Sequence, residues 1–594
     1  MFKMAYAEIH DILNRAKLDQ LPKLDISILR NVVVEGMIPY LKFLAYEMGF
    51  RAEIRMGDYD NIVQESLAGG SGIVKKDTDC ILIFSKIDGL SWSLARNFAS
   101  LEKEEIQNQI LNIHKTITNV LGGIRNQTNG MILWCGFELP LYPSLGIGDG
   151  QIASGQSEII AELNNFLRSS LRNIPNAYYV DLNLCLARVG GRAFYDERYW
   201  HIGRAPYSRE GLAEIASEAF KYIRAGKGKN KKCLVLDCDN VLWGGIIGED
   251  GLSGIKLSKV YPGSPYTEFQ QEVLNLYSRG IILALCSKNN DKDVWEVFRT
   301  HPDMVLKENH IAAAEINWED KATNLKKIAI NLNIGLESMV FIDDSEFEVN
   351  LVRDAIPEIT VIHLPKDKSV EYRNILASCG LFDTLALSAE DRERGDMYRL
   401  EALRKKMQNE APDLETYLRS LEMVVELNLV DDYTLPRVAQ LTQKTNQFNL
   451  TTRRYSEADI RAFMQAEEVD VLTLRLSDKF GDSGLVGVCI LKRSKQTALI
   501  DTLLLSCRVL GRGVEDVFIA QALKLARQRK CESVIAEYYQ TAKNEQVKNF
   551  YPRRGFESIP RSSDKEGWRY CISLSGPLME EPSYFKEIRS FLNE

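Results

Sequence analysis

Short apolar runs alternate with amphipathic segments along the N-terminal part of the chain. Runs at 80–84, 131–135 and 176–180 are rich in β-forming residues and predict buried parallel strands. A run of valines at 32–34 predicts another strand, and the segment 37–50 that follows it has helical spacing. This alternation predicts a doubly wound α/β domain.

Three further apolar runs, at 233–236, 281–285 and 339–342, predict a second parallel sheet, and the first ends in Asp237 and Asp239. Buried acids are costly unless they pair or bind a cation, and ligands of open α/β sheets collect at the carboxyl ends of the strands. The two carboxylates could share one Mg²⁺, while Asp237 attacks phosphorus and Asp239 handles the proton. An acidic turn without chemistry is the alternative interpretation of this pair alone.

The next two runs end in a hydroxyl and in further acids. Ser287 and its neighbouring amides can hold a phosphate oxygen, and Asp343 and Asp344 follow the third run. Lys321 lies between them, in the first turn of a predicted amphipathic helix. Chance supplies any one of these features, but all four in this order indicate a phosphoryl-transfer site.

This order of acid, hydroxyl, lysine and acid resembles the four motifs of the haloacid dehalogenase superfamily of phosphotransferases. The stretches LDCDNVLWGGIIGEDG, LALCSKNN, INWEDKATNL and FIDDSEFE resemble the FkbH-like family within it, although Val241 stands where that family usually has threonine. The resemblance covers roughly residues 195 to 560. It implies that Ser287 and Lys321 hold phosphoryl oxygens. The metal ligands that it implies are Asp237, Asp239, Asp343 and Asp344.

A third α/β domain is predicted towards the C-terminus, with strands at 471–476, 485–490 and 500–505. The last strand runs into a glycine loop and a helix, a geometry that suits the binding of pyrophosphate. Arg508-x-x-Gly511-x-Gly513 resembles the acyl-CoA loop of the GNAT acyltransferases, and a structural turn is the alternative. The residues that this resemblance assigns to the cofactor are Arg508, Gly511, Arg512, Gly513 and Asn544, with Tyr551 as the acid that protonates a departing thiolate.

Two further features leave alternatives open. An enzyme thiol could carry the acyl group, with Cys238 as the first candidate and Cys286 and Cys507 after it, or each could be a buried small hydrophobe. The polar run KTNQFNLTTRRY, residues 444 to 455, resembles a hallmark of the FkbH-like family, or it could be a solvated loop.

The N-terminal domain occupies the position at which the FkbH-like family often has a domain similar to the SGNH hydrolases. Those enzymes need an early serine and a late Asp-x-x-His. Here the early loop is expected at 56–59 and lacks the serine, and the spacing of Asp196 and His201 is wrong. We therefore predict a degenerate domain without hydrolase activity.

The linker AGKGKNKK at 225–232 and a charged stretch after residue 386 suggest the domain boundaries. The predicted parts are the SGNH-like domain at 1–225, the haloacid dehalogenase-like domain at 231–385, a helical connector at 386–422, the GNAT-like domain at 423–576 and a tail at 577–594.

Composition narrows the setting. The formal net charge of −8 does not suggest a protein that binds nucleic acid, since such proteins usually carry a basic surface. No apolar run is long enough to span a membrane. The charged first residues predict an amphipathic helix and not a signal peptide. Eleven cysteines without a CxxC pair predict reduced thiols in a cytoplasmic protein. The oligomeric state stays open.

The family resemblance implies a Mg²⁺-dependent enzyme that dephosphorylates 1,3-bisphosphoglycerate and transfers the glyceryl unit to an acyl carrier protein. The acceptor is the thiol of the carrier's phosphopantetheine, in polyketide or related biosynthesis. The alternative is a Mg²⁺-dependent phosphatase of a soluble metabolite or sugar phosphate, with the GNAT-like domain as a binding module. A scaffold without catalysis is a third hypothesis, which the intact set of four motifs disfavours.

Overall fold

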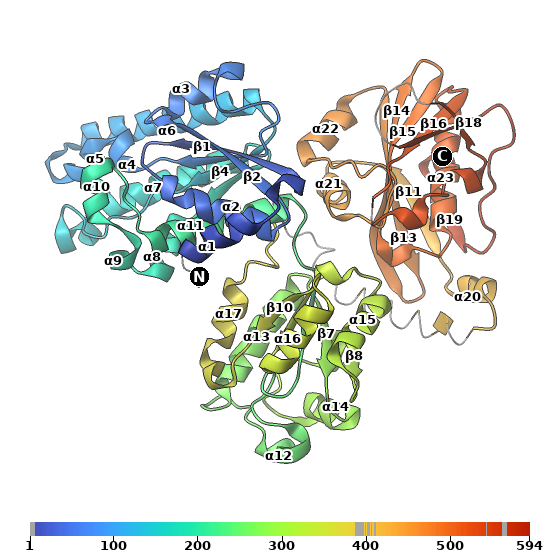
Figure 1. Cartoon of the computed structure of the whole chain (residues 1–594). Helices are drawn as coiled ribbons and strands as arrows, with labels where there is room; N and C mark the ends of the chain where they lie inside the picture. The colour runs from blue at the N-terminus through green and yellow to red at the C-terminus, as the bar shows by residue number, and fades with distance from the viewer. Residues whose placement is uncertain are drawn as a thin grey trace. The chain divides into compact units, whose positions relative to one another are not determined.

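The computed structural model describes residues 6–386, 397, 400, 404, 407–408, 411–541, 543–560 and 567–593. About half of the connector that we predicted at 386–422 therefore lies outside the described residues. The chain divides into two compact units, 1–229 with 383–385 and 230–382 with 386–594 (Figure 1). No helix among the described residues has the length and apolar character needed to cross a membrane.

The N-terminal unit contains a parallel sheet of five strands in the order β2-β1-β3-β4-β5, covered on both faces. Its strands are β1 (Lys23–Arg30), β2 (Arg51–Tyr59), β3 (Cys80–Phe84), β4 (Met131–Cys135) and β5 (Ala177–Val180). Helices α2 (Ile38–Glu47) and α11 (Arg209–Gly226) pack on one face, and α6 (Lys103–Gln127) and α7 (Gln156–Arg172) pack on the other. This is the predicted doubly wound architecture.

The first strand of this sheet was predicted at the wrong place. Val32 and Val34 are buried, but they lie in the loop after β1, and the strand itself is Lys23–Arg30. Its polar residues Asp25 and Ser27 concealed it, because both are buried and satisfied by distant partners. Asp25 accepts a hydrogen bond of 2.8 Å from Arg55, and Ser27 donates one of 2.9 Å to the Ile73 carbonyl.

The middle part of the chain, residues 230–382, forms a second parallel sheet in the order β10-β9-β6-β7-β8. Its strands are β6 (Cys233–Leu236), β7 (Ile282–Ser287), β8 (Ile311–Ile316), β9 (Met339–Asp343) and β10 (Thr360–His363). Its helices are α12 (Ile247–Gly254), α13 (Ser264–Ser278), α14 (Asp291–Thr300), α15 (Lys321–Leu332), α16 (Glu346–Ala355) and α17 (Tyr372–Ser378).

Parallel register brings the predicted motifs to one edge of this sheet. Leu236 pairs with Leu285 on one side and with Ile342 on the other. The residues that follow these positions therefore emerge side by side at the carboxyl ends of β6, β7 and β9, where α/β proteins bind ligands. Successive strand residues alternate between the two cores of this part, as a sheet covered on both faces requires.

The C-terminal part is built on a mixed sheet in the order β17-β18-β16-β15-β14-β13-β11-β19. Its strands are β11 (Val424–Leu429), β12 (Phe448–Asn449), β13 (Val469–Asp478), β14 (Gly481–Ser494), β15 (Thr497–Leu505), β16 (Ser533–Tyr538), β17 (Glu557–Ser558), β18 (Trp568–Ser573) and β19 (Glu587–Ser590). Helices α20 (Leu414–Ser420) and α23 (Val514–Gln528) pack on one face, and α21 (Leu435–Lys444) and α22 (Glu457–Gln465) pack on the other.

The connection from β15 through α23 to β16 is the parallel crossover of this otherwise largely antiparallel sheet (Figure 1). It follows the glycine loop, as predicted from the sequence. Residues 577–594, which we expected to form a tail, include β19, which pairs with β11 and belongs to the sheet.

The buried centre of β4 should govern the stability of the N-terminal unit. We expect Leu133→Ala to lower its free energy of unfolding by about 2–5 kcal/mol, because the side chain is fully buried and its removal leaves a cavity. Leu111→Ala is the matched control, since Leu111 is 53% exposed on α6 and should change stability by less than about 0.5 kcal/mol. Urea unfolding followed by fluorescence tests this, and equal losses in the two variants would contradict it.

Candidate active site

A buried cluster of charges stands at the carboxyl edge of the middle sheet. Asp237 follows β6, Asp343 ends β9 and Lys321 begins α15, and all three are almost fully buried. The Lys321 ammonium lies 2.9 Å from Asp237 Oδ2 and 2.5 Å from Asp343 Oδ2. The structure therefore brings together three of the predicted residues, which are spread over more than 100 positions of the sequence, from 237 to 343.

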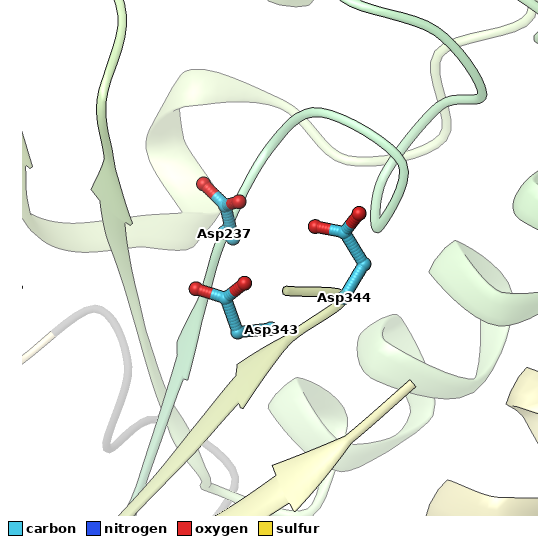
Figure 2. A group of neighbouring side chains, drawn as sticks. All are labelled: Asp237, Asp343 and Asp344. Carbon is cyan, nitrogen blue, oxygen red and sulfur yellow. The ribbon is translucent and has the colours of Figure 1, made fainter. Parts of the chain in front are cut away.

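Asp344 joins Asp237 and Asp343 in a group that can hold a metal ion. One carboxylate oxygen from each of the three lies within 4.8 Å of the others, and Figure 2 shows the three side chains converging. Asp237 Oδ1 is buried and accepts no hydrogen bond within the described part of the chain. Lys366 Nζ approaches Asp344 Oδ2 at 3.1 Å from the exposed side. Three carboxylates with an unsatisfied buried oxygen fit Mg²⁺, which prefers oxygen ligands.

Burial and mutual repulsion shape the electrostatics of this group. Burial, with a further contribution from Asp237, raises the pKa of Asp343 from its ordinary 3.8 to about 6. Burial also raises the pKa of Asp344. For Lys321, burial disfavours the ammonium form, but Asp237 and Asp343 outweigh it and the pKa is raised, so the side chain stays protonated.

Asp239 lies in the loop after β6, two residues beyond Asp237. Its carboxylate is not part of the group formed by the three acids. Its Oδ1 accepts hydrogen bonds from Trp243 Nε1 at 2.8 Å and from the Ile247 amide at 3.1 Å. Its Oδ2 accepts one from Asn289 Nδ2 at 3.0 Å. Burial raises its pKa. The structure therefore brings together three of the four predicted metal ligands, whereas the carboxylate of the fourth, Asp239, is held by Trp243, Ile247 and Asn289.

Asn289 is a residue of this site that the sequence reasoning did not select. Besides Asp239, it donates a hydrogen bond of 3.0 Å to Ser287 Oγ, so it fixes both the acid and the hydroxyl. The signal was present, because Asn289 stands two residues after Ser287 in the same loop at the end of β7. Trp243 was missed as well, since a tryptophan in an apolar stretch gives no sign of its hydrogen bond to Asp239.

The cysteines of the middle part are poorly placed as nucleophiles. Cys238 and Cys286 are fully buried, and burial raises the pKa of both thiols well above the usual range. The thiolate is the reactive form, so these environments favour the interpretation as core residues. Cys507 is only half-buried and borders the glycine loop of the C-terminal part.

The glycine loop has the predicted backbone. Gly511 and Gly513 have φ angles of +78° and +74°, a region that favours glycine. In the part of the chain that the structure describes, the amides of these two glycines donate to no protein acceptor. They stand at the N-terminus of α23, where an anion is favoured. A Cβ at Gly513 would lie 1.7 Å from the Tyr584 hydroxyl, whereas one at Gly511 would meet no atom within 4 Å.

The two arginines of that loop do not face a ligand as predicted. Arg508 and Arg512 are buried. Arg512 donates to Asp478 Oδ2 at 3.3 Å and to the Arg508 carbonyl at 2.8 Å, and Arg508 donates to Ser506 Oγ at 3.1 Å. Their guanidinium groups therefore donate to acceptors inside the domain. The groups of the loop that remain for an anion are its main-chain amides.

Asn544 is likewise committed to internal partners. It is fully buried, accepts a hydrogen bond of 2.7 Å from the Thr541 amide and donates bonds of 2.9 Å to the carbonyls of Asn449 and Tyr539. Tyr551 is 1% exposed, and its phenol has no hydrogen-bond partner among the described residues. Burial raises the pKa of this phenol, so it stays protonated.

The N-terminal unit shows no assembled hydrolase triad at the positions that we weighed. Residues 56–59, which we expected in a loop, lie in β2. Asp196 accepts a hydrogen bond of 3.1 Å from the Tyr199 amide as the N-cap of α10 (Glu197–Gly203), whereas His201 is exposed on the same helix. The absence of hydrolase activity remains a prediction.

Comparison with known proteins found no matching family model and no matching curated protein. The chain is similar to the crystal structure of the N-terminal part of the protein BF1531 from Bacteroides fragilis, which contains a phosphatase domain complexed with Mg. Identity is 28%, the match covers 64% of this chain and all of that one, and the TM-score is 0.57.

Two acetyltransferase structures match about a quarter of the chain. One is the ribosomal-protein-S18-alanine N-acetyltransferase from Escherichia coli, with 14% identity, 26% of this chain, 96% of that chain and a TM-score of 0.21. The other is Ard1 from Thermoplasma volcanium, with 18% identity, 25% of this chain, 97% of that chain and a TM-score of 0.20. The predicted fold class, α/β in several domains, is confirmed.

The raised pKa of Asp343 predicts how stability depends on pH. A carboxyl whose pKa is higher in the folded state favours folding below its ordinary 3.8, and this contribution is lost as the pH rises through about 6. Without Mg²⁺, the free energy of unfolding should therefore fall across this window, and Asp343→Asn should weaken the fall. Urea unfolding in EDTA at several pH values tests this. The same pH dependence in parent and variant would contradict it.

Proposed function

We propose that the chain is a Mg²⁺-dependent phosphatase-type enzyme whose chemistry starts at Asp237. The observation that carries this proposal is the buried group of Asp237, Asp343 and Asp344 with Lys321 between two of its members. The similarity to a protein with a Mg-complexed phosphatase domain, at 28% identity, supports the same assignment. Bound at the three acids, Mg²⁺ would neutralise charge on the phosphoryl group.

Each residue of the site has a separate role in the proposed reaction. An Asp237 oxygen attacks phosphorus, the bond from phosphorus to the leaving oxygen breaks, and Asp239 gives that oxygen a proton. Ser287 and Lys321 hold the remaining phosphoryl oxygens. Water then attacks the aspartyl-phosphate, Asp239 takes its proton, and release of phosphate restores Asp237. The raised pKa of Asp239 suits both of its roles.

The substrate that we propose is the acyl phosphate 1,3-bisphosphoglycerate, and the product is a glyceryl thioester on an acyl carrier protein. The carrier's thiolate would displace phosphate from the acyl carbon, and the site at Asp237 would remove the second phosphate. The resemblance of the four motifs to the FkbH-like family supports this, and so does an open rim around the site. Trp318 and Phe347, which follow β8 and β9, are each 71% exposed there.

The glycine loop is our candidate for the phosphate of the carrier's phosphopantetheine. Its support is that the amides of Gly511 and Gly513 donate to no acceptor among the described residues and stand at the N-terminus of a helix of 15 residues. The buried phenol of Tyr551 is protonated and has no hydrogen-bond partner among the residues that the structure describes, so it would be available as the acid for a departing thiolate.

A phosphatase of a soluble metabolite is the second candidate. Three residues that were assigned to the cofactor favour this candidate, because their side chains form hydrogen bonds inside the domain. They are Arg508, Arg512 and Asn544. In that case the C-terminal part would be a binding module. The two candidates differ in whether a carrier protein accepts the glyceryl unit, so loading of a carrier decides between them.

Asp237→Asn should keep the fold and lower phosphate release by at least about a thousandfold, because an amide is a poor nucleophile and a weaker metal ligand. Release of phosphate from p-nitrophenyl phosphate and from 1,3-bisphosphoglycerate, with Mg²⁺, measures this. Asp354→Asn is the matched control, since Asp354 is exposed on α16. Parental activity in Asp237→Asn would refute the assignment.

Gly511→Val should separate the two activities. A Cβ at Gly511 would meet no atom within 4 Å, so we expect the fold to tolerate the change, but valine is strained at a φ of +78° and would push an anion off the amides. Circular dichroism and thermal unfolding of the variant check that it is folded. We expect glyceryl loading, followed by the intact mass of the holo-carrier, to fall at least about tenfold, with phosphate release unchanged. Undiminished loading in this variant, or phosphate release without loading in the parent, would favour the second candidate.

A further inference from the structure

The crossover strands of the C-terminal part separate at their carboxyl ends. β15 pairs with β16 from Thr497 to Ile500, opposite Ser533 to Ala536, and the pairing stops there. Five residues of β15 remain beyond this point, and they lead directly into the glycine loop. Separated parallel strands leave a slot with unpaired main-chain groups on both sides, which an extended chain can fill.

A stretch of this chain's own sequence fills the slot. We call residues 447–452 the inner segment. Within it, Phe448 and Asn449 form β12, antiparallel to Leu505 and Leu504. The next residue joins the two sides, because the Leu450 amide donates to the Leu503 carbonyl at 3.2 Å and the Leu450 carbonyl accepts from the Tyr539 amide at 2.9 Å.

The side chains of the inner segment complete the fit. Phe448 is 5% exposed, Leu450 is fully buried, and both belong to the core beneath α23. The Phe448 ring meets Phe550 edge to face at 5.2 Å between centroids. Asn449 is fully buried and accepts a hydrogen bond of 2.8 Å from the Thr452 amide, which shapes the turn that leaves the slot.

Charged residues hold the C-terminal end of the inner segment in place. Arg453 donates to Asp501, which is buried on β15, and to Glu537 on β16 at 3.0 Å. The Tyr455 hydroxyl donates to the other oxygen of Asp501 at 2.6 Å. Arg454 donates to the Gln443 and Thr445 carbonyls at the end of α21, at 2.6 and 3.0 Å. The polar run at 444–455 is therefore an anchor and not a solvated loop.

An arm of phosphopantetheine would need the same positions. Its phosphate would bind the amides of the glycine loop, and its two amide groups would extend from there along the free edge of β15. That edge is occupied by the hydrogen bonds of residues 448–450, and the apolar space beside it is filled by Phe448 and Leu450. The arm and the inner segment therefore exclude one another.

We propose that the inner segment is a built-in competitor of the thiol arm, which must leave the slot before the arm can enter. The inference rests on the proposed function and specifies how its second site is regulated. An occupied slot keeps the site closed to free thiols and amides. Opening requires the Asp501 contacts to break, so a ligand must gain enough on the loop and in the slot to replace them.

A reversible lock tests this inference in the full-length chain. Phe448 and Leu505 are direct neighbours across an antiparallel pair, a separation at which disulfides form. The double variant Phe448→Cys/Leu505→Cys should close the slot when oxidised and release it when reduced. The matched control is Arg493→Cys/Ala498→Cys, a directly opposed pair in the β14–β15 hairpin. Binding of coenzyme A, which carries the same arm, is measured by calorimetry.

We expect coenzyme A to bind the oxidised lock at least tenfold more weakly than the reduced one, with no such difference in the control. Phosphate release from p-nitrophenyl phosphate should be equal in all forms. Equal affinity in both redox states of the lock, or no binding to either state, would overturn the inference. Redox-dependent binding without loading of any carrier would leave the inference standing and refute the glyceryl transfer proposed above.

Discussion

The placement of Lys321 between Asp237 and Asp343 is the interaction on which the middle part of the structure depends. Three acids and one lysine in a buried cluster carry a formal charge of −2, counted from Asp237, Asp343, Asp344 and Lys321. Burying charge is costly unless it is compensated. Within the cluster Lys321 leaves two negative charges over, and Lys366 approaches Asp344 only from the exposed side. A divalent cation balances the cluster, so the stability of the site and its chemistry have the same requirement.

The sheet explains why this cluster could be predicted from the sequence. Each motif directly follows an apolar run, and parallel strands carry their ends to one edge, so the positions of Asp237 and Asp343 in the sequence already predict that they lie together. Asn289 and Trp243 could not be found in this way. Their role depends on which of several nearby side chains donates to Asp239, and this is decided by loop geometry. β1 was missed for a related reason, since its buried Asp25 is satisfied by Arg55, thirty residues away.

The C-terminal part shows a limit of motif reasoning. The backbone of the glycine loop could be predicted, because glycine adopts a positive φ without steric strain, whereas cofactor binding by Gly511 and Gly513 stays a prediction. The arginines were assigned to a ligand, but a side chain of that length can turn inward, and here Arg512 donates to Asp478. Likewise the run at 444–455 gave no sign of its function. Arg453 and Tyr455 act through Asp501, almost fifty residues further on, and only the fold brings them together.

Charge also separates the two sites that we propose. The acids at the edge of the middle sheet repel an anionic substrate unless a cation is present, so the proposed phosphoryl site would bind phosphate through metal, lysine and hydroxyl together. The proposed anion site at the glycine loop has no cation requirement, because it would use main-chain amides and the N-terminus of α23, although Glu515 and Asp516 follow in the first turn of that helix. Removal of Mg²⁺ therefore acts on the first site and not on the second.

The slot beside the loop depends instead on hydrogen bonds to β15 and β16, which an incoming chain can exchange one for one. The exchange of these hydrogen bonds alone costs little, because the leaving and entering groups satisfy the same donors and acceptors. The main cost of opening is the removal of Phe448 and Leu450 from the core and the loss of the Asp501 contacts, which the ligand must offset. A closed slot of this kind can be stable and still open to the one ligand that reproduces its contacts.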